Sequence, residues 1–421
     1  MTERDQRPRS AVSGWVGLAG MVGLAAWIAV AAYWGMDGPM AGMAAVVACG
    51  LPMVAWSLIV DKVHRRASTG IDWSLRRPWA EVRETAFAKI AGLWVTWAAI
   101  AGFYALGRWY WQGGYVFAMQ VLAGVVPALL LLSVPYIFWI DRRLIEPRDG
   151  AYAFGQWLSG RAHDRDAVAR HARAWAVKGF FTAFMLSIVP GNWHELMHRD
   201  PWAMLADPMA AAFGLITLMF LIDVAFATVG YVLTMRPLDA HIRSANPYLG
   251  GWVSALACYP PFILIARGGP VDYETGGANW SWWLAGSPRL TFVWMVPLVV
   301  LTGVYAWATV AFGLRFSNLT HRGIITNGPY RITKHPAYLA KNLFWWMSAM
   351  PFLAVSGDLA TGVRNTVLMG VVSGVYYWRA RTEEKHLGAD PEYRAYAAWM
   401  DRHGPVPRVL GKVGLRTGGW S

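Results

Sequence analysis

The feature that most constrains this chain is a series of ten apolar runs, most of them long enough to cross the hydrocarbon core of a bilayer as helices. Lipid offers no hydrogen bonds to the backbone, so a run of this length must satisfy its own amides and carbonyls by forming an α-helix. The expected fold class is therefore all-α, a polytopic membrane helix bundle of about ten transmembrane helices. The runs are 12–34, 40–60, 86–107, 115–140, 175–191, 208–234, 248–267, 290–313, 341–356 and 363–379.

Composition and charge support a membrane location. The chain has 421 residues, of which 56% are hydrophobic, so a water-soluble domain is excluded and the lipid bilayer is the expected partner. The formal net charge is +13, but the basic residues cluster in short loops between apolar runs, as orientation signals do, so nucleic acid is not an expected partner. Cys49 and Cys258 both lie inside apolar runs, which indicates packing roles and excludes a disulfide framework or a thiolate metal site.

The distribution of positive charge predicts the orientation. Alternate loops are rich in Lys and Arg, and they fall on one side if both termini are cytoplasmic. The apolar run after the first ten residues has no small-residue cleavage site, which favours a retained first helix over a removed signal peptide. We therefore expect a multi-pass inner-membrane protein, divided into an N-terminal bundle of about eight helices (1–315) and a C-terminal module (316–421).

Two polar, aromatic-rich segments flank the last pair of apolar runs. They are GPYRITKHPAY, at 328–338, and RARTEEKHLG, at 379–388. An out-and-back helical pair returns the chain to the side from which it started, so the two segments should meet at the cytoplasmic face. This arrangement suits an enzyme that holds a water-soluble cofactor against a lipid-phase substrate.

The first segment has the features of a ligand-binding helix start. Pro336 fits the first turn of a helix, which places His335 at or near the N-cap, where free backbone amides can hold an anion. Tyr330, Tyr338 and Trp345 add aromatic faces that suit an adenine ring or a cationic sulfonium.

The second segment supplies charge. Arg379 and Glu383 are four residues apart on one helical face, and Glu384 lies beside them, so two carboxylates can accept hydrogen bonds from ribose hydroxyls or an amino group. For any one of these residues, ordinary anchoring at the membrane interface is the competing interpretation.

Together these motifs resemble those of isoprenylcysteine carboxyl methyltransferases and related phospholipid methyltransferases over residues 312–408. The matching positions are Gly328-Pro329-Tyr330, Lys334-His335-Pro336-Ala337-Tyr338, Arg379, Glu383-Glu384, Tyr393, Tyr396 and Pro405 or Pro407. Lys334 stands where this family usually has arginine, and Ala340 stands where glycine is common.

The resemblance implies an S-adenosylmethionine-dependent methyltransferase that acts on a lipid-like or prenylated amphiphilic substrate. It implies Arg379 and Glu383 as catalytic residues near the reacting group. The cofactor contacts that it implies are Tyr330, Lys334, His335, Pro336, Tyr338 and Glu384. Methyl transfer requires no metal ion, so no metal site is expected in this module.

Three further residues are expected to contact the substrate. Asp223 is an ionisable residue in the middle of an apolar run, which is a functional hypothesis by default, and pairing with a buried polar neighbour is the competing interpretation. Arg236 belongs to a polar cytoplasmic segment expected to line the cofactor or head-group pocket, with an ordinary basic loop as the alternative. Trp345 contributes an aromatic face.

Three alternatives stay open. Ten-helix sterol reductases use a related C-terminal hairpin to bind NADPH, so hydride transfer is the main rival. The motif HELMH, at 194–198, matches the zinc-protease pattern, but nearby prolines predict a loop there and no third ligand is evident close by. A lipid transporter or scaffold would explain the helices but not the clustered motifs.

Overall fold

The computed structural model describes residues 7–405, so the predicted motif position Pro407 lies outside the described part, as do residues 1–6. The fold is all-α, as expected, and its only sheet within those residues pairs two short antiparallel strands. The α-helices are α1 (Gly14–Trp34), α2 (Pro39–Ile59), α3 (Trp79–Leu106), α4 (Gly114–Asp141), α5 (Gly150–Leu158), α6 (Arg165–Met197), α7 (Pro201–Ala206), α8 (Pro208–Val232), α9 (Leu249–Leu256), α10 (Trp280–Trp283), α11 (Pro288–Phe312), α12 (Pro336–Ala349), α13 (Leu359–Leu387) and α14 (Pro391–His403). The short elements are η2 (Val63–Arg65), η3 (Ala67–Thr69), η4 (Arg108–Trp111), η5 (Arg236–Leu238), η6 (Gly313–Arg315), η7 (Gly328–Arg331), β1 (Ser244–Ala245) and β2 (Thr320–His321).

Seven helices of the described part are long and apolar enough to cross a membrane, which confirms a multi-pass architecture but not the expected count of ten. They are α1, α2, α3, α4, α6, α8 and α11, the last extended by η6. Each coincides with a predicted apolar run, because a continuous apolar stretch of this length has no alternative in lipid.

The other three predicted spans differ from expectation. The run 248–267 is not one continuous helix: α9 ends at Leu256, and turns and an irregular stretch follow as far as α10. Helix α12 has 14 residues and so rises only about 21 Å, which is short of a full crossing. Helix α13 has 29 residues, but polar residues such as Arg364 and Asn365 near its start and charged residues in its last turns leave it outside the set of apolar spans.

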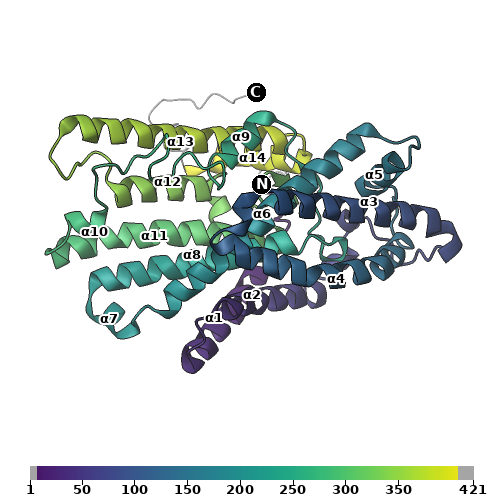
Figure 1. Cartoon of the computed structure of the whole chain (residues 1–421), viewed down its shortest axis with the longest axis horizontal. Coiled ribbons are helices and arrows are strands. Elements are labelled where there is room, and N and C mark those ends of the chain that lie inside the picture. The colour runs from purple at the N-terminus through teal and green to yellow at the C-terminus, as the bar shows by residue number, and fades with distance from the viewer. Residues whose placement is uncertain (1–6, 406–421) are drawn as a thin grey trace.

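Figure 1 shows α8, α11, α12 and α13 side by side, with α3, α4 and α5 on the opposite side of the molecule. Helix α11 contacts both α8 and α12, α12 contacts α13, and α9 packs on α13. Helix α6 connects the two groups, because it contacts α4 and α5 as well as α8.

The loops gather in two sets, as the charge pattern predicts. On the basic side, Ser68 donates to Asp239 at 2.8 Å, and β1 pairs with β2, which joins the loop after α8 to the loop after α11. On the other side, Trp193 Nε1 donates to the carbonyl of Met36 at 3.0 Å. The predicted basic loops therefore lie together, at the end of the bundle that carries the C-terminal motifs.

Arg322 holds the basic loops together from inside. Its guanidinium is 3% exposed and donates to the carbonyls of five residues in the loops and helix ends around it. These acceptors are Gly230, Leu233, Ala240, Leu314 and Phe316. Beside it, Arg315 forms a buried ion pair with Asp239 at 2.5 Å. Buried backbone carbonyls need donors, and one arginine satisfies several of them here.

Candidate functional site

The two polar segments meet, as the sequence predicts. His335 is the N-cap residue of α12, and its Nε2 lies 2.9 Å from Oε1 of Glu384, which is in the last turn of α13. Lys334 Nζ lies 3.0 Å from the same carboxylate oxygen, and Arg381 Nη1 lies 3.3 Å from the other. Glu384 therefore fastens the start of α12 to the end of α13.

This clamp keeps Glu384 ionised. Burial opposes ionisation, but the hydrogen bond and charge of His335 and the charge of Lys334 outweigh burial and lower the pKa of Glu384 to about 2. With three basic partners, Glu384 is engaged in holding His335 rather than free to bind a ligand.

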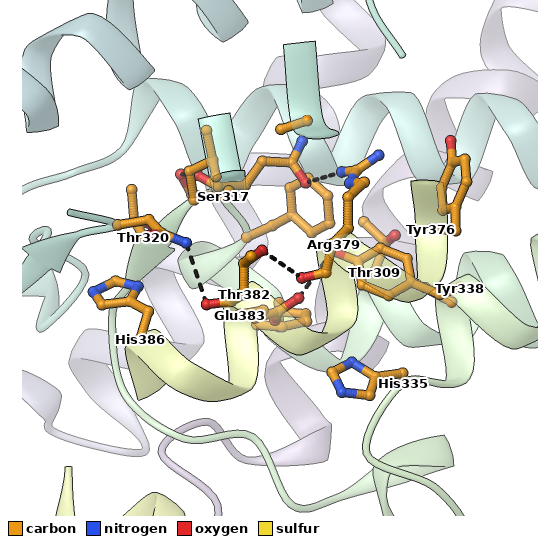
Figure 2. Close-up of a pocket in the computed structure, with 18 of the residues that line it drawn as sticks. Thr309, Ser317, Thr320, His335, Tyr338, Tyr376, Arg379, Thr382, Glu383 and His386 are labelled. Carbon is orange, nitrogen blue, oxygen red and sulfur yellow. Dashed lines mark hydrogen bonds between the residues drawn. The ribbon is translucent and has the colours of Figure 1, made fainter. Parts of the chain in front are cut away.

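A cavity lies beside this clamp, between α9, α11, α12, α13 and the loop after α11. It contains about 940 Å³ of empty space, part of it open to solvent, of which about 100 Å³ can take the centre of a water molecule. Figure 2 shows Tyr338, Tyr376, Arg379 and Glu383 around this space. The predicted residues that line it are Tyr330, Lys334, His335, Tyr338, Arg379 and Glu383.

Arg379 is a buried cation surrounded by aromatic rings. Its side chain is 5% exposed, and its guanidinium carbon lies 5.7, 5.2 and 5.0 Å from the ring centres of Tyr259, Tyr338 and Tyr376. Its Nη2 donates to Oδ1 of Asn318 at 3.3 Å. No carboxylate within residues 7–405 forms an ion pair with Arg379, which leaves its charge able to pair with an anionic group.

Glu383 faces the same cavity without a basic partner. Its Oε2 accepts a hydrogen bond from the hydroxyl of Tyr338 at 2.8 Å, and no Lys, Arg or His of the described part pairs with it. Burial and the charge of Glu383 hold the pKa of Tyr338 well above its ordinary value, so the tyrosine stays a donor. Arg379 and Glu383 thus place a cation and an anion, neither of them ion-paired within residues 7–405, on neighbouring turns of α13.

The three residues predicted to contact the substrate do not lie together. Asp223 is buried in α8, where its carboxylate accepts hydrogen bonds from Tyr305, at 2.9 Å, and from Thr309. Both donors line the cavity, so Asp223 lies behind its wall. Trp345 packs edge-on against Tyr376, with ring centres 5.1 Å apart, and also stands outside the lining.

Arg236 lies elsewhere. It belongs to η5 and lines a different cavity in the N-terminal helices, so the expectation that its segment borders the C-terminal motifs is wrong for this residue. Later residues of the same polar segment do reach the cavity at α12 and α13. Asn246 lines this cavity, and Oγ of Ser244 lies 2.9 Å from Nε2 of His386, another lining residue. Pro336 is buried at the first position of α12 and shapes that helix start.

Sequence reasoning missed the aromatic and amide residues that surround Arg379. Tyr376 precedes Arg379 by three positions on α13, a helical spacing that marks them as neighbours. Tyr259, Tyr305 and Asn318 come from segments with no local signal, because only the packing of α9, α11 and the following loop brings them to α13.

The HELMH motif is helical, so the expected loop is wrong. Helix α6 continues through Pro190 to Met197. Potential ligand atoms of His194, His198 and Asp37 lie within 4.8 Å of one another, so Asp37 is a third potential metal ligand from a distant segment. These exposed side chains could hold a metal ion. Glu195, however, pairs with Arg199 and accepts a hydrogen bond from Thr217 at 3.0 Å, so it is not free to activate water.

Comparisons with known proteins cover only the C-terminal part. The profile of a family described as a protein of unknown function (DUF1295) matches residues 280–400, from α10 into α14. No curated protein and no solved structure matches the chain. The matched segment contains every residue predicted to be catalytic or to contact the cofactor, whereas the finer resemblance to isoprenylcysteine enzymes stays a prediction.

Proposed function

We propose that this membrane protein transfers a methyl group from S-adenosylmethionine to an amphiphilic acceptor, with the cofactor held in the cavity at α12 and α13. The observation that carries the proposal is the pair of uncompensated charges, Arg379 and Glu383, inside an aromatic-lined cavity. The amino-acid part of this cofactor has a carboxylate and an ammonium group. Arg379 suits the carboxylate and Glu383 suits the ammonium or a ribose hydroxyl.

The aromatic lining suits the third charged group. Tyr305, Tyr338 and Tyr376 line the cavity, and aromatic rings attract a sulfonium cation. When bound, the cofactor supplies an electrophilic methyl group: an acceptor lone pair forms the new bond to carbon while the carbon–sulfur pair returns to sulfur. The chain's own residues position the two reactants and exclude water.

The balance of charge favours this cofactor over NADPH. A reduced dinucleotide brings a pyrophosphate and a further phosphate, which call for several basic residues. Among the basic residues that line the cavity, Lys334 already pairs with Glu384, and Lys341 lies over the rings of Tyr305 and Trp345. Arg379 and Lys341 are the two lining Lys or Arg side chains without a carboxylate partner among the described residues, fewer cations than three phosphates call for.

NADPH-dependent reduction of a double bond is the second candidate. Two carboxylate–tyrosine pairs, Asp223 with Tyr305 and Glu383 with Tyr338, border the cavity and could donate the proton that such a reduction needs after hydride transfer.

Ligand binding separates the two. Detergent-purified protein is titrated with S-adenosylmethionine, its demethylated product and NADPH, and thermal stabilisation is followed. Methyl transfer predicts stabilisation by the first two ligands and its loss in Arg379→Gln. Stabilisation by NADPH alone would replace this proposal with the reductase.

A further inference from the structure

The N-terminal helices contain a second cavity with a strongly basic lining. It lies between α3, α4, α6 and the segment from η5 to β1, and it contains about 1510 Å³ of empty space, part of it open to solvent. Three carboxylates face it, from Asp141, Asp149 and Asp164. Six basic side chains face it, from Lys89, Arg148, Arg170, Lys178, Arg236 and Arg243.

The carboxylates are already engaged. Lys89 lies 2.6 Å from Asp141 and 3.1 Å from Asp149, and Arg170 lies 3.3 Å from Asp164. All three acids are therefore paired with two of the six bases. The remaining four cations have no close carboxylate among the acids of this cavity.

Two of the remaining cations donate to neutral acceptors. Lys178 Nζ donates to Oγ1 of Thr234 at 2.6 Å, and Arg236 Nη1 donates to the carbonyl of Thr69 at 3.2 Å. Arg243 lies 3.8 Å from Asp239, whose carboxylate is bound more closely by Arg315. An anion in this space would meet several donors without displacing an ion pair.

His241 lies in the positive electrostatic potential of this basic cavity. Its Nδ1 is buried and has no hydrogen-bond partner within residues 7–405. Burial, followed by the charges of Arg236 and Arg243, lowers the pKa of His241 to about 3. A neutral imidazole with an unused buried nitrogen lines the cavity and is available to a polar ligand.

An apolar cavity adjoins the basic one. It contains about 1070 Å³ of empty space, partly open, and is lined by aromatic and aliphatic side chains of α3, α6 and the α9 region. His171 and Trp175 line both cavities, so the two share a wall. Phe103 and Phe262 are 60% and 52% exposed, which places the apolar cavity on an outward, lipid-accessible face.

We propose that the two cavities together bind one membrane lipid with an anionic phosphodiester head group, its head in the basic cavity and its chains in the apolar one. Charge complementarity argues for the head group, because Arg236 and Lys178 face it with only neutral acceptors, and Arg243 has only a 3.8 Å pair with Asp239, a carboxylate already bound by Arg315. The adjoining apolar cavity argues for a lipid over a soluble anion, which would have no use for it. Arg236 then binds an amphiphile, in a site separate from the methyl-transfer cavity.

Binding of lipids with matched acyl chains tests this proposal. The purified full-length protein is titrated with phosphatidylglycerol, phosphatidylcholine and soluble glycerol phosphate, and binding is followed by thermal shift and by native mass spectrometry. Phosphatidylglycerol should stabilise the protein and stay bound in the gas phase, with at least about tenfold tighter apparent binding than phosphatidylcholine. Equal binding of the two lipids would overturn the proposal, and so would an equal response to glycerol phosphate alone.

Two independent variants locate the site. Arg236→Gln removes a head-group donor, and Ala99→Trp fills the apolar cavity; each should weaken phosphatidylglycerol binding about tenfold. The matched controls are Arg76→Gln and Ala98→Trp, which change exposed residues outside both cavities and should have no effect. Unchanged lipid binding in both test variants would overturn the site. Binding of S-adenosylmethionine should persist in them, which separates this result from the proposed function.

Discussion

Tyr338 donates its phenolic hydrogen to Oε2 of Glu383 across 2.8 Å, although 45 residues separate them in the chain. The bond connects the first turn of α12 to the last turns of α13 and orients a carboxylate that has no basic partner in the described part. Arg379, one turn earlier on α13, stacks its guanidinium against the same tyrosine, 5.2 Å from the ring centre. One tyrosine therefore positions both charges that the proposed cofactor needs.

Removing the Tyr338 hydroxyl should weaken cofactor binding while the fold is kept. In Tyr338→Phe the ring still packs on Arg379. The Glu383 carboxylate, however, loses the only side-chain hydrogen bond that it accepts from the described residues. We expect about tenfold to hundredfold weaker binding of S-adenosylmethionine, measured by calorimetric titration. Tyr377→Phe is the matched control, since Tyr377 is exposed on the same helix and should bind normally. Equal affinities in the two variants would remove Tyr338 from the site.

Cofactor binding should require the positive charge of Arg379 and not only the size of its side chain. Arg379→Gln leaves a polar side chain but no cation among the three tyrosines, and we expect at least about tenfold weaker cofactor binding. Lys385→Gln removes an exposed positive charge from the same helix and should bind as the wild type does. A cofactor analogue with an amidated carboxylate lacks the group that Arg379 is proposed to bind. Equal binding of this analogue to wild type and Arg379→Gln would confirm the carboxylate contact. If the analogue still binds wild type about tenfold better, the contact is elsewhere.

Acid should remove the stabilising effect of the Glu384 clamp. The pKa of Glu384 is about 2 in the folded protein, below its ordinary value of 4.5, so the folded state takes up the proton less readily than the unfolded state. The contribution, at most about 3 kcal/mol, is fully present above pH 4.5 and is lost as the pH falls towards 2. Thermal unfolding should show Glu384→Gln less stable than wild type at pH 7, with the gap narrowing by pH 3. Glu392→Gln, at an exposed position of α14, should show no such pH-dependent gap.

Asp223 should affect the acceptor rather than the cofactor. Its carboxylate fixes the hydroxyls of Tyr305 and Thr309, which form part of the cavity wall. We expect Asp223→Asn to raise the KM for a lipid-like acceptor, with the affinity for S-adenosylmethionine unchanged. A loss of cofactor affinity would place Asp223 on the cofactor side. A loss of kcat alone would favour proton transfer, as the reductase requires.

Replacing Arg322 should destabilise the whole basic end. Arg322→Lys keeps the positive charge but cannot reach five carbonyls, which leaves several buried acceptors without donors. We expect a loss of about 2–5 kcal/mol, measured as a fall in the thermal unfolding midpoint. Arg331→Lys is the control, because Arg331 is exposed in η7 and its replacement should leave the midpoint in place. Equal midpoints in the two variants would contradict the role assigned to Arg322.

Much of the candidate site was predictable because its signals are local. Pro336 marks a helix start, so the N-cap position of His335 follows from the sequence, and the structure confirms it. The convergence of His335 and Glu384 also follows, since an apolar out-and-back pair must return to its own side. The partners of Arg379 were not predictable, because Tyr259 and Asn318 reach it only through the packing of separate segments.

Apolar run length, read directly from the sequence, determined the all-α membrane architecture and located the seven spanning helices, because lipid leaves a long apolar segment no other way to satisfy its backbone. It also predicted three further spans that are not among the seven. Tertiary structure alone decided that 248–267 forms a short helix and turns packed on α13, that HELMH extends α6, and that Arg236 faces a second cavity. These outcomes depend on which surfaces meet. Hydropathy describes each segment by itself, whereas burial, ion pairing and cavity walls arise from contacts between segments far apart in the chain.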